Sequence, residues 1–162
     1  MRRGGSQATL TRLVERIRRA IPDVTFRTTM IVGFPGETEG DFAELNAFCS
    51  EMEFERLGVF TYSDEENTAA FELPDKVPAR VAERRRLELM QQQARIAARK
   101  NRALVGTELP VLVEGPSSES ELLLSGRLND SEVGELRAGE FYTVRISQAL
   151  EHDLLGSVIA RQ

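Results

Sequence analysis

The sequence predicts an α/β fold in which a region of alternating helices and strands is followed by a small all-β barrel. Up to residue 62, apolar residues recur at spacings that indicate helix, strand, helix and strand in that order. This order is typical of a parallel sheet or a partial (β/α) barrel, because parallel strands need crossover connections. After Gly106 the pattern changes to four short strand-like runs, which suggest a small barrel of OB-like size.

The first expected helix covers residues 6–21, with Ser6 as its N-cap. Its apolar residues share one side of the helix, which we expect to face the core: Leu10, Leu13, Val14, Ile17 and Ile21. Residues 24–32 follow as a strand. The strand is rich in β-branched residues and wholly apolar at its end, a pattern typical of a strand buried on both faces.

A Gly-Phe-Pro-Gly turn at residues 33–36 connects this strand to the next helix. Glycines let the backbone approach a ligand closely, and Pro35 fixes the turn. Since α/β proteins bind ligands at the carboxyl ends of their strands, the turn is the main candidate for a cofactor-facing loop. A purely structural turn capped by Thr38 explains the same residues equally well. The turn lacks the lysine of a phosphate-binding loop.

Thr38 begins the second helix, and Asp41 completes a variant of the capping box. The residues of this helix expected in the core are Phe42, Leu45, Phe48, Cys49 and Met52. A strand at 56–62 and a polar loop at 63–78 come next. Residues 79–103 then form a long charged helix without glycine or proline, whose apolar residues are Val81, Leu87, Met90, Ala94, Ala97 and Ala98.

The strand-like runs of the barrel are 109–113, 121–127, 140–146 and 155–159. We place a domain boundary near residues 95–105. The predicted organisation has three parts: an α/β region at 1–78, a connecting helix at 79–104 and a barrel at 105–162.

Charge and hydropathy exclude several function classes. The net charge of −5 argues against strong non-specific nucleic-acid binding. No apolar run approaches the roughly 20 residues that a membrane helix needs. The basic residues at the N-terminus are not followed by the apolar stretch of a secretory signal, so we expect a cytoplasmic protein.

Residues that could carry chemistry are few. Cys49 is the single cysteine, which excludes an internal disulfide and a metal or iron–sulfur site built from cysteines of this chain. Its place on an apolar helix face predicts a buried, inert thiol. His152 is the single histidine, so a metal site is not expected, and the acidic residues at 64–66 indicate a solvated loop. We therefore predict no catalytic residue and no metal ligand.

Several segments taken together resemble the radical S-adenosylmethionine methylthiotransferases. They are MRRGGS at 1–6, RTTMIVGFPGET at 27–38, DF at 41–42, ERLGVFTYS at 55–63 and LPD at 73–75. The tail is similar to the TRAM barrel of these enzymes, at residues 109–115, 126–127, 138–141 and 153–156.

The resemblance implies a fold and a cofactor. The fold would be the last strands and helices of a radical S-adenosylmethionine partial (β/α) barrel, followed by a TRAM barrel. The whole enzymes use S-adenosylmethionine and two 4Fe-4S clusters, one of them on a Cys-x3-Cys-x2-Cys motif. The segment at 31–37 resembles the motif after the fifth barrel strand, which packs on the adenosine, and residues 59–62 match the sixth strand. The implied cofactor contacts are Ile31, Gly33, Phe34, Pro35, Gly36 and Glu37.

The segment at 55–68 is most similar to the branch that methylthiolates the β-carbon of an aspartate in a small-subunit ribosomal protein. That protein would dock on the TRAM barrel, with RNA as a further contact. The alternatives are a fragment of the tRNA-modifying sister branch, a non-catalytic TRAM binding module and a marginally folded remnant.

The sequence departs from the family in two places. Both cysteine triads are absent, so we expect the C-terminal part of an enzyme that is inactive without its N-terminal half. Between Arg127 and Val133 a family strand is replaced by a short segment, which predicts a shortened barrel with an unpaired edge. His152 stands where the family usually has tyrosine.

Overall fold

A computed structural model describes residues 5–22, 24–116, 124–128, 138–150 and 153–161. The chain divides into two compact units, Met1–Ala97 and Ala98–Gln162. Each unit is described by itself below. The three-part division at residues 78 and 104 stays a prediction.

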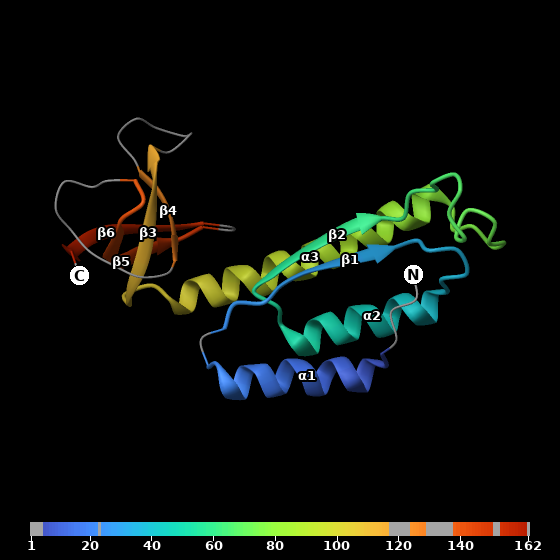
Figure 1. The fold of residues 1–162 in the computed structure, drawn as a ribbon, viewed down its shortest axis with the longest axis horizontal. Coiled ribbons are helices and arrows are strands. Elements are labelled where there is room, and N and C mark those ends of the chain that lie inside the picture. Colours follow the sequence, from blue (N-terminus) through green and yellow to red (C-terminus); the bar gives the residue numbers. More distant parts are fainter. Residues whose placement is uncertain (1–4, 23, 117–123, 129–137, 151–152, 162) are drawn as a thin grey trace. The chain divides into compact units, whose positions relative to one another are not determined.

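The first unit contains two strands and three helices in the expected order (Figure 1). Its elements are α1 (Gln7–Ala20), β1 (Arg27–Val32), α2 (Glu39–Met52), β2 (Arg56–Thr61) and the first part of α3 (Ala79–Ala103). The strands pair in parallel, with Arg27 opposite Arg56 and Val32 opposite Thr61. The predicted order of helix, strand, helix and strand is confirmed.

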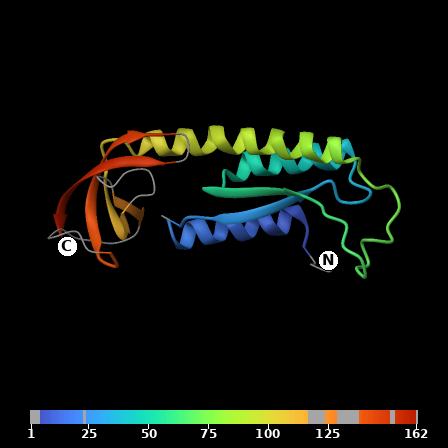
Figure 2. The ribbon, with the colours of Figure 1, turned by 90° about the horizontal axis from the view of Figure 1, so that it is seen from above.

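Only one face of the β1–β2 sheet has buried side chains, and in Figure 2 α2 and α3 run along the same side of the two strands. Val32, Leu57 and Val59 are buried on this covered face, where they join a core built from α2 and α3. On the other face Ile31 and Phe60 are exposed. The expectation that the first strand is buried on both faces is therefore wrong, because Arg27, Thr29 and Ile31 on its second face are exposed.

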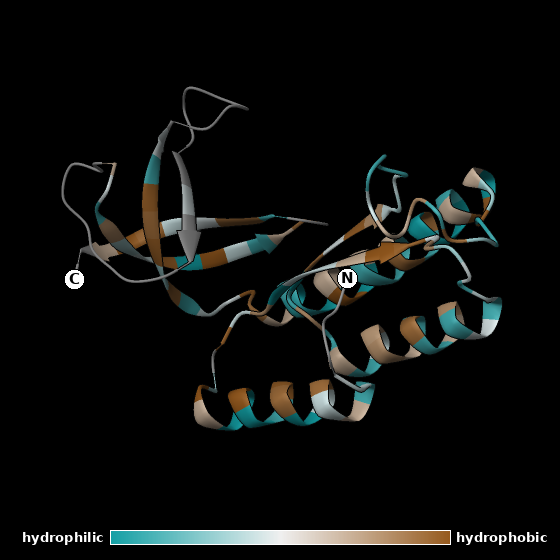
Figure 3. Ribbon diagram, turned by 45° about the vertical axis from the view of Figure 1, so that its right-hand side comes forward, coloured by the Kyte–Doolittle hydropathy of each residue, from teal (hydrophilic) through white to brown (hydrophobic). Residues whose placement is uncertain are grey.

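Helix α1 begins as predicted, since the Thr9 N–H donates to Ser6 Oγ at 3.3 Å. Figure 3 shows hydrophobic and hydrophilic residues alternating along it. The prediction that the apolar side of α1 faces the core is only partly correct. Val14 is buried, whereas Leu10, Leu13 and Ile21 are exposed, because α1 packs along a narrower side than its apolar residues occupy.

Helix α2 has the predicted capping box, in which the Thr38 N–H donates to Asp41 Oδ2 and the Asp41 N–H donates to Thr38 Oγ1. Of its predicted core residues, Leu45 is partly buried and the others are buried: Phe42, Phe48, Cys49 and Met52. The guanidinium of Arg18 in α1 donates to the last α2 carbonyls, of Met52 at 2.6 Å and Glu53 at 3.2 Å. A cation at this end also complements the helix dipole.

Of the apolar residues of helix α3, Ala97 is buried and Met90 packs against the core, whereas Leu87 is exposed. The buried residues of the helix are Ala82, Arg85, Leu89, Gln93, Ile96, Ala97 and Asn101. Three of them are polar, and two of these have partners outside the helix, since Arg85 binds Glu37 and the Gln93 amide donates to the Phe54 carbonyl at 2.9 Å. None of the described helices is long and apolar enough to span a bilayer.

The second unit is an antiparallel sheet in the order β4-β3-β5-β6. Its strands among the described residues are β3 (Glu108–Pro116), β4 (Leu124–Leu128), β5 (Phe141–Ala149) and β6 (Leu154–Arg161), which confirms the four predicted strands, although β3, β5 and β6 are longer than predicted. The buried core is Val113, Tyr142, Val144 and Ile146. The shortened segment after Arg127, from residue 129 on, and His152 lie outside the described residues. Closure of the sheet into a barrel stays a prediction.

Candidate functional site

The Gly-Phe-Pro-Gly turn connects the carboxyl end of β1 to the N-terminus of α2. Gly33 and Gly36 have φ angles of +79° and +83°, in the left-handed region that favours glycine. Within the turn the Glu37 N–H donates to the Phe34 carbonyl at 2.9 Å. The Gly36 N–H donates to the Asp75 carbonyl at 2.9 Å, which ties the turn to the loop before α3. The sequence identified both glycines correctly as special backbone positions.

The turn packs directly against the first part of α3. A Cβ added at Gly33 would lie 2.5 Å from the Ala82 Cβ, so the backbone approaches the helix more closely than any other residue would allow. Pro35 is buried as well. The turn is thus a rigid corner rather than a loose loop.

Glu37 points back into the protein, with only 11% of its side chain exposed. One carboxylate oxygen, Oε2, accepts the Gly33 N–H at 2.9 Å. The other, Oε1, accepts a hydrogen bond from Arg85 Nη1 at 2.6 Å. The Glu37 carboxylate therefore connects the backbone of the turn to Arg85 of α3.

The uncovered side of the β1–β2 sheet is named here the open face. It consists of Arg27, Thr29, Ile31, Arg56, Gly58 and Phe60. At its carboxyl end Ile31 and Phe60 are register partners, 44% and 61% exposed. Exposed aliphatic and aromatic side chains placed side by side suit a flat, partly apolar ligand group.

Aromatic contacts fix the neighbouring strand end and loop. The rings of Phe34 and Tyr62 meet edge to face with centroids 5.2 Å apart. The Lys76 ammonium lies 5.8 Å from the Tyr62 ring centroid and forms an ion pair with Asp64. The hydrogen bond from Lys76 lowers the pKa of Asp64, while burial raises the pKa of Tyr62. Residues 64–66 are exposed, which confirms the predicted solvated loop, and Lys76 holds one end of it through Asp64.

The predicted cofactor contacts differ in accessibility. Ile31 and Gly36 are exposed, Phe34 is half-buried, and Gly33 and Pro35 are buried. Their roles stay predictions, and the geometry separates residues that a ligand can touch from those that shape the turn.

Two residues of the site went unpredicted. Phe60 had a signal, because it alternates with the buried Leu57 and Val59 along β2. Arg85 had none, since it lies in a run of three arginines with nothing to distinguish the buried one.

Cys49 is buried, as predicted, and burial raises the pKa of its thiol to about 11, which disfavours the reactive thiolate. In the part of the chain that the structure describes, no three His, Cys, Asp or Glu side chains are grouped to hold a metal ion. A 4Fe-4S cluster needs several cysteine thiolates, and the whole sequence has one cysteine. The residues of this chain do not fit such a cluster.

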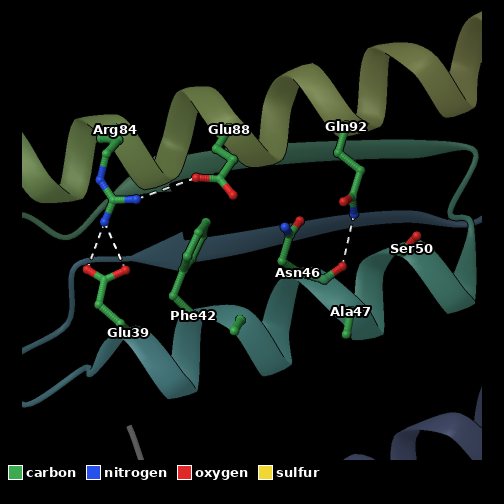
Figure 4. A pocket seen from close by; sticks show the side chains of 9 residues that line it. Glu39, Phe42, Asn46, Ala47, Ser50, Arg84, Glu88 and Gln92 are labelled. Carbon is green, nitrogen blue, oxygen red and sulfur yellow. Dashed lines mark hydrogen bonds and ion pairs between the residues drawn. The ribbon is translucent and has the colours of Figure 1, made fainter.

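A groove of about 410 Å³ lies between α2 and α3 (Figure 4). Arg84 spans it, binding Glu39 at 2.7 Å and Glu88 at 3.5 Å. Farther along, the Gln92 amide donates to the Asn46 carbonyl at 2.9 Å. The contacts of Arg84 with Glu39 and of Gln92 with Asn46 join the two helices, and the groove is the seam between them rather than a site with ligand chemistry.

No family model matches the chain. Curated relatives match it nearly throughout. A ribosomal protein uS12 methylthiotransferase RimO from Solibacter usitatus is 46% identical over 173 residues, covering 99% of this chain and 37% of the relative. Proteins of the same name from Syntrophotalea carbinolica and Sorangium cellulosum are 47% and 48% identical over 98% of the chain. The chain spans only 35–37% of the length of these three relatives.

Proposed function

Because this chain is homologous over nearly its whole length to the RimO ribosomal protein uS12 methylthiotransferases, we propose that it is the C-terminal part of such an enzyme. In this proposal the first unit carries the last strands of a radical S-adenosylmethionine barrel. The second unit is the TRAM domain. The enzyme would act in the cytoplasm, where ribosomal proteins are modified.

The proposed role of the first unit is to bind the adenosine part of S-adenosylmethionine. The observation that carries it is the open face, where Ile31 and Phe60 are exposed directly before the Gly-Phe-Pro-Gly turn. Ile31 would contact the base, and Gly36 would offer a backbone without a Cβ in the way. The other predicted contacts are Gly33, Phe34, Pro35 and Glu37, of which the buried ones would act by shaping the turn.

The iron–sulfur chemistry is proposed to depend on residues outside these 162. One cysteine cannot hold either of the two clusters that the family uses, so we assign no reaction step to this chain alone. Anaerobic treatment with iron and sulfide should leave the purified chain colourless. A brown protein with cluster absorbance would contradict this assignment.

The proposed substrate is an aspartate of ribosomal protein uS12, whose β-carbon would receive the methylthio group. The names of the relatives favour this substrate over tRNA. The second unit is proposed to dock the protein. Immobilised full-length chain should retain purified uS12 and not tRNA. Retention of tRNA alone would assign the sister branch, and retention of neither would refute docking by this chain.

The adenosine site is tested by titrating S-adenosylhomocysteine into the chain with ¹³C-labelled isoleucine methyl groups. We expect the Ile31 methyl resonance to shift with ligand, while that of Ile159, in β6 of the second unit, stays in place. Inosine serves as the control ligand, since it lacks the adenine amino group. Equal shifts at both methyl groups, or none at Ile31, would refute the site.

A further inference from the structure

Arg85 is a buried cation beside the turn, with 3% of its side chain exposed. It lies on α3, one helical turn after Ala82, the residue that touches Gly33. The ring of Phe42 covers one side of its guanidinium, 5.6 Å from the ring centroid. Burying an arginine is costly unless it is paired, and since Nε has no hydrogen-bond partner among the described residues, the partners of its two terminal nitrogens indicate why it lies there.

The two carboxylates that Arg85 binds flank the N-cap of α2, with Glu37 directly before Thr38 and Glu39 directly after it. Arg85 Nη1 donates to Glu37 Oε1 at 2.6 Å and to the Glu37 carbonyl at 3.2 Å, and Nη2 donates to Glu39 Oε1 at 2.9 Å. The N-terminus of a helix carries partial positive charge, so a cation is unfavourable there without such partners. The two hydrogen bonds to Glu37 hold its side chain and its backbone at once.

The chain of contacts continues into the turn. Glu37 uses its second oxygen to accept the Gly33 N–H at 2.9 Å. Gly33 lies two residues after Ile31, the exposed residue at the end of the open face. Arg85 is therefore connected through Glu37 to the corner next to the proposed adenosine contacts, although it is itself too buried to touch a ligand.

We propose that Arg85 is a positioning residue for the adenosine site, acting through Glu37 on the Gly33 N–H and so on the shape of the turn. This inference rests on the proposed function. A preorganised turn binds its ligand without first losing conformational freedom. Arg84 shares Glu39 with Arg85 but differs in its surroundings, since its side chain is half-exposed and also pairs with Glu88 of the same helix.

The test compares the conservative variant Arg85→Lys with the matched control Arg84→Lys in the full chain. Lysine keeps the charge but is a single ammonium without the planar fork that spans Glu37 and Glu39. Three quantities are measured: the melting temperature, the Gly33 amide proton shift, and the affinity for S-adenosylhomocysteine from the Ile31 methyl shift. All binding is measured well below the melting temperature.

We expect Arg85→Lys to weaken the affinity about tenfold, since the lost hydrogen bond loosens a preorganised site, and to move the Gly33 amide shift. Arg84→Lys should change the affinity by no more than about twofold, as is usual for an exposed ion pair, and should leave the Gly33 amide shift in place. If Arg85→Lys fails to fold, Glu37→Gln takes its place, because the amide keeps an acceptor for Gly33 while losing its charge for Arg85.

The outcomes separate the two proposals. If the wild-type chain binds the ligand and Arg85→Lys binds equally well with an unchanged Gly33 amide shift, the positioning role is wrong and the adenosine site stands. If Arg85→Lys lowers the melting temperature but leaves the affinity unchanged, Arg85 stabilises the fold and has no positioning role. If S-adenosylhomocysteine leaves the wild-type Ile31 methyl unmoved, the proposed site fails and the positioning role fails with it.

Discussion

The two faces of the β1–β2 sheet are made from adjacent residues, but one face is buried and the other is exposed. On the covered face Val32, Leu57 and Val59 are buried beneath helices, whereas on the open face Ile31 and Phe60 remain exposed. Side chains alternate along a strand, so each residue of one face has a neighbour in sequence on the other. The same twelve residues therefore provide both the core and an apolar surface.

This contrast separates stability from binding. Burial of apolar area is what stabilises the first unit, and the covered face supplies it. The open face contributes little to folding, so its exposed apolar side chains are better explained by a ligand or partner. The turn at 33–36 belongs to both faces. Gly33 packs on α3, whereas no atom of the described residues lies within 4 Å of a Cβ added at Gly36.

The largest expected effect is at the centre of the covered side. Leu89 of α3 is fully buried in the same core cluster as Val32 and Val59. Leu89→Ala should lower the free energy of unfolding by about 2–5 kcal/mol, through lost burial and the cavity left behind. Leu87→Ala, on the exposed side of α3, should change it by less than about 0.5 kcal/mol. Urea unfolding of both variants checks the difference, and equal losses would contradict the assigned orientation of α3.

The next effect concerns the turn, where two glycines have similar φ angles but different surroundings. Gly36→Ala should cost about 1–2 kcal/mol, from the left-handed backbone alone, because nothing lies within 4 Å of the added Cβ. Gly33→Ala has the same backbone cost, and its Cβ also clashes with Ala82, which should add about 1–3 kcal/mol. Thermal melts of the two variants measure the difference directly. Equal costs would show that the turn is not packed on α3.

A smaller effect is expected at the start of α2, and it depends on pH. Thr38→Ala should cost about 1 kcal/mol by removing the N-cap. Its hydrogen bonds to Asp41 lower the pKa of that carboxyl in the folded chain. The contribution of Asp41 is therefore fully present above its unfolded pKa and is lost as the pH falls through its folded pKa.

Asp41→Asn should accordingly lower the melting temperature at pH 7, with the difference from wild type shrinking on acidification below the ordinary pKa of aspartate. Glu44→Gln is a control, since Glu44 is exposed on the same helix beyond the cap. A difference that grows in acid would contradict the assigned cap.

Local signals in the sequence predicted the parts of the fold that depend on neighbouring residues. The Ser6 cap, the pairing of Thr38 with Asp41 and the glycines of the turn each act within a few residues, and all of them are present. The order of strands and helices follows from spacing in the same way.

Features that depend on distant residues were missed. The apolar end of β1 does not reveal whether an element covers its second face. The apolar residues of α3 do not reveal that the helix also buries polar side chains: Arg85 pairs with Glu37, 48 residues away, and Gln93 with Phe54, 39 residues away. Sequence pattern treats polar residues as exposed, so such partners cannot be foreseen. For the site, the turn was predictable, but its support by Arg85 was not.

The smallest change in stability should come from the open face, where adjacent residues give a matched pair. Phe60→Thr keeps a good strand former at an exposed position and should change the free energy of unfolding by less than about 0.5 kcal/mol. Val59→Thr, one residue earlier, places a hydroxyl in the core and should cost about 1–3 kcal/mol.

Binding should show the reverse order for this pair. Under the proposed adenosine site, Phe60→Thr removes apolar contact beside Ile31 and weakens S-adenosylhomocysteine binding, while folded Val59→Thr retains it. Urea unfolding and the Ile31 methyl titration on the same two variants measure both quantities. If Phe60→Thr destabilised the chain as much as Val59→Thr, the open face would belong to the core, and the separation of binding from stability would fail.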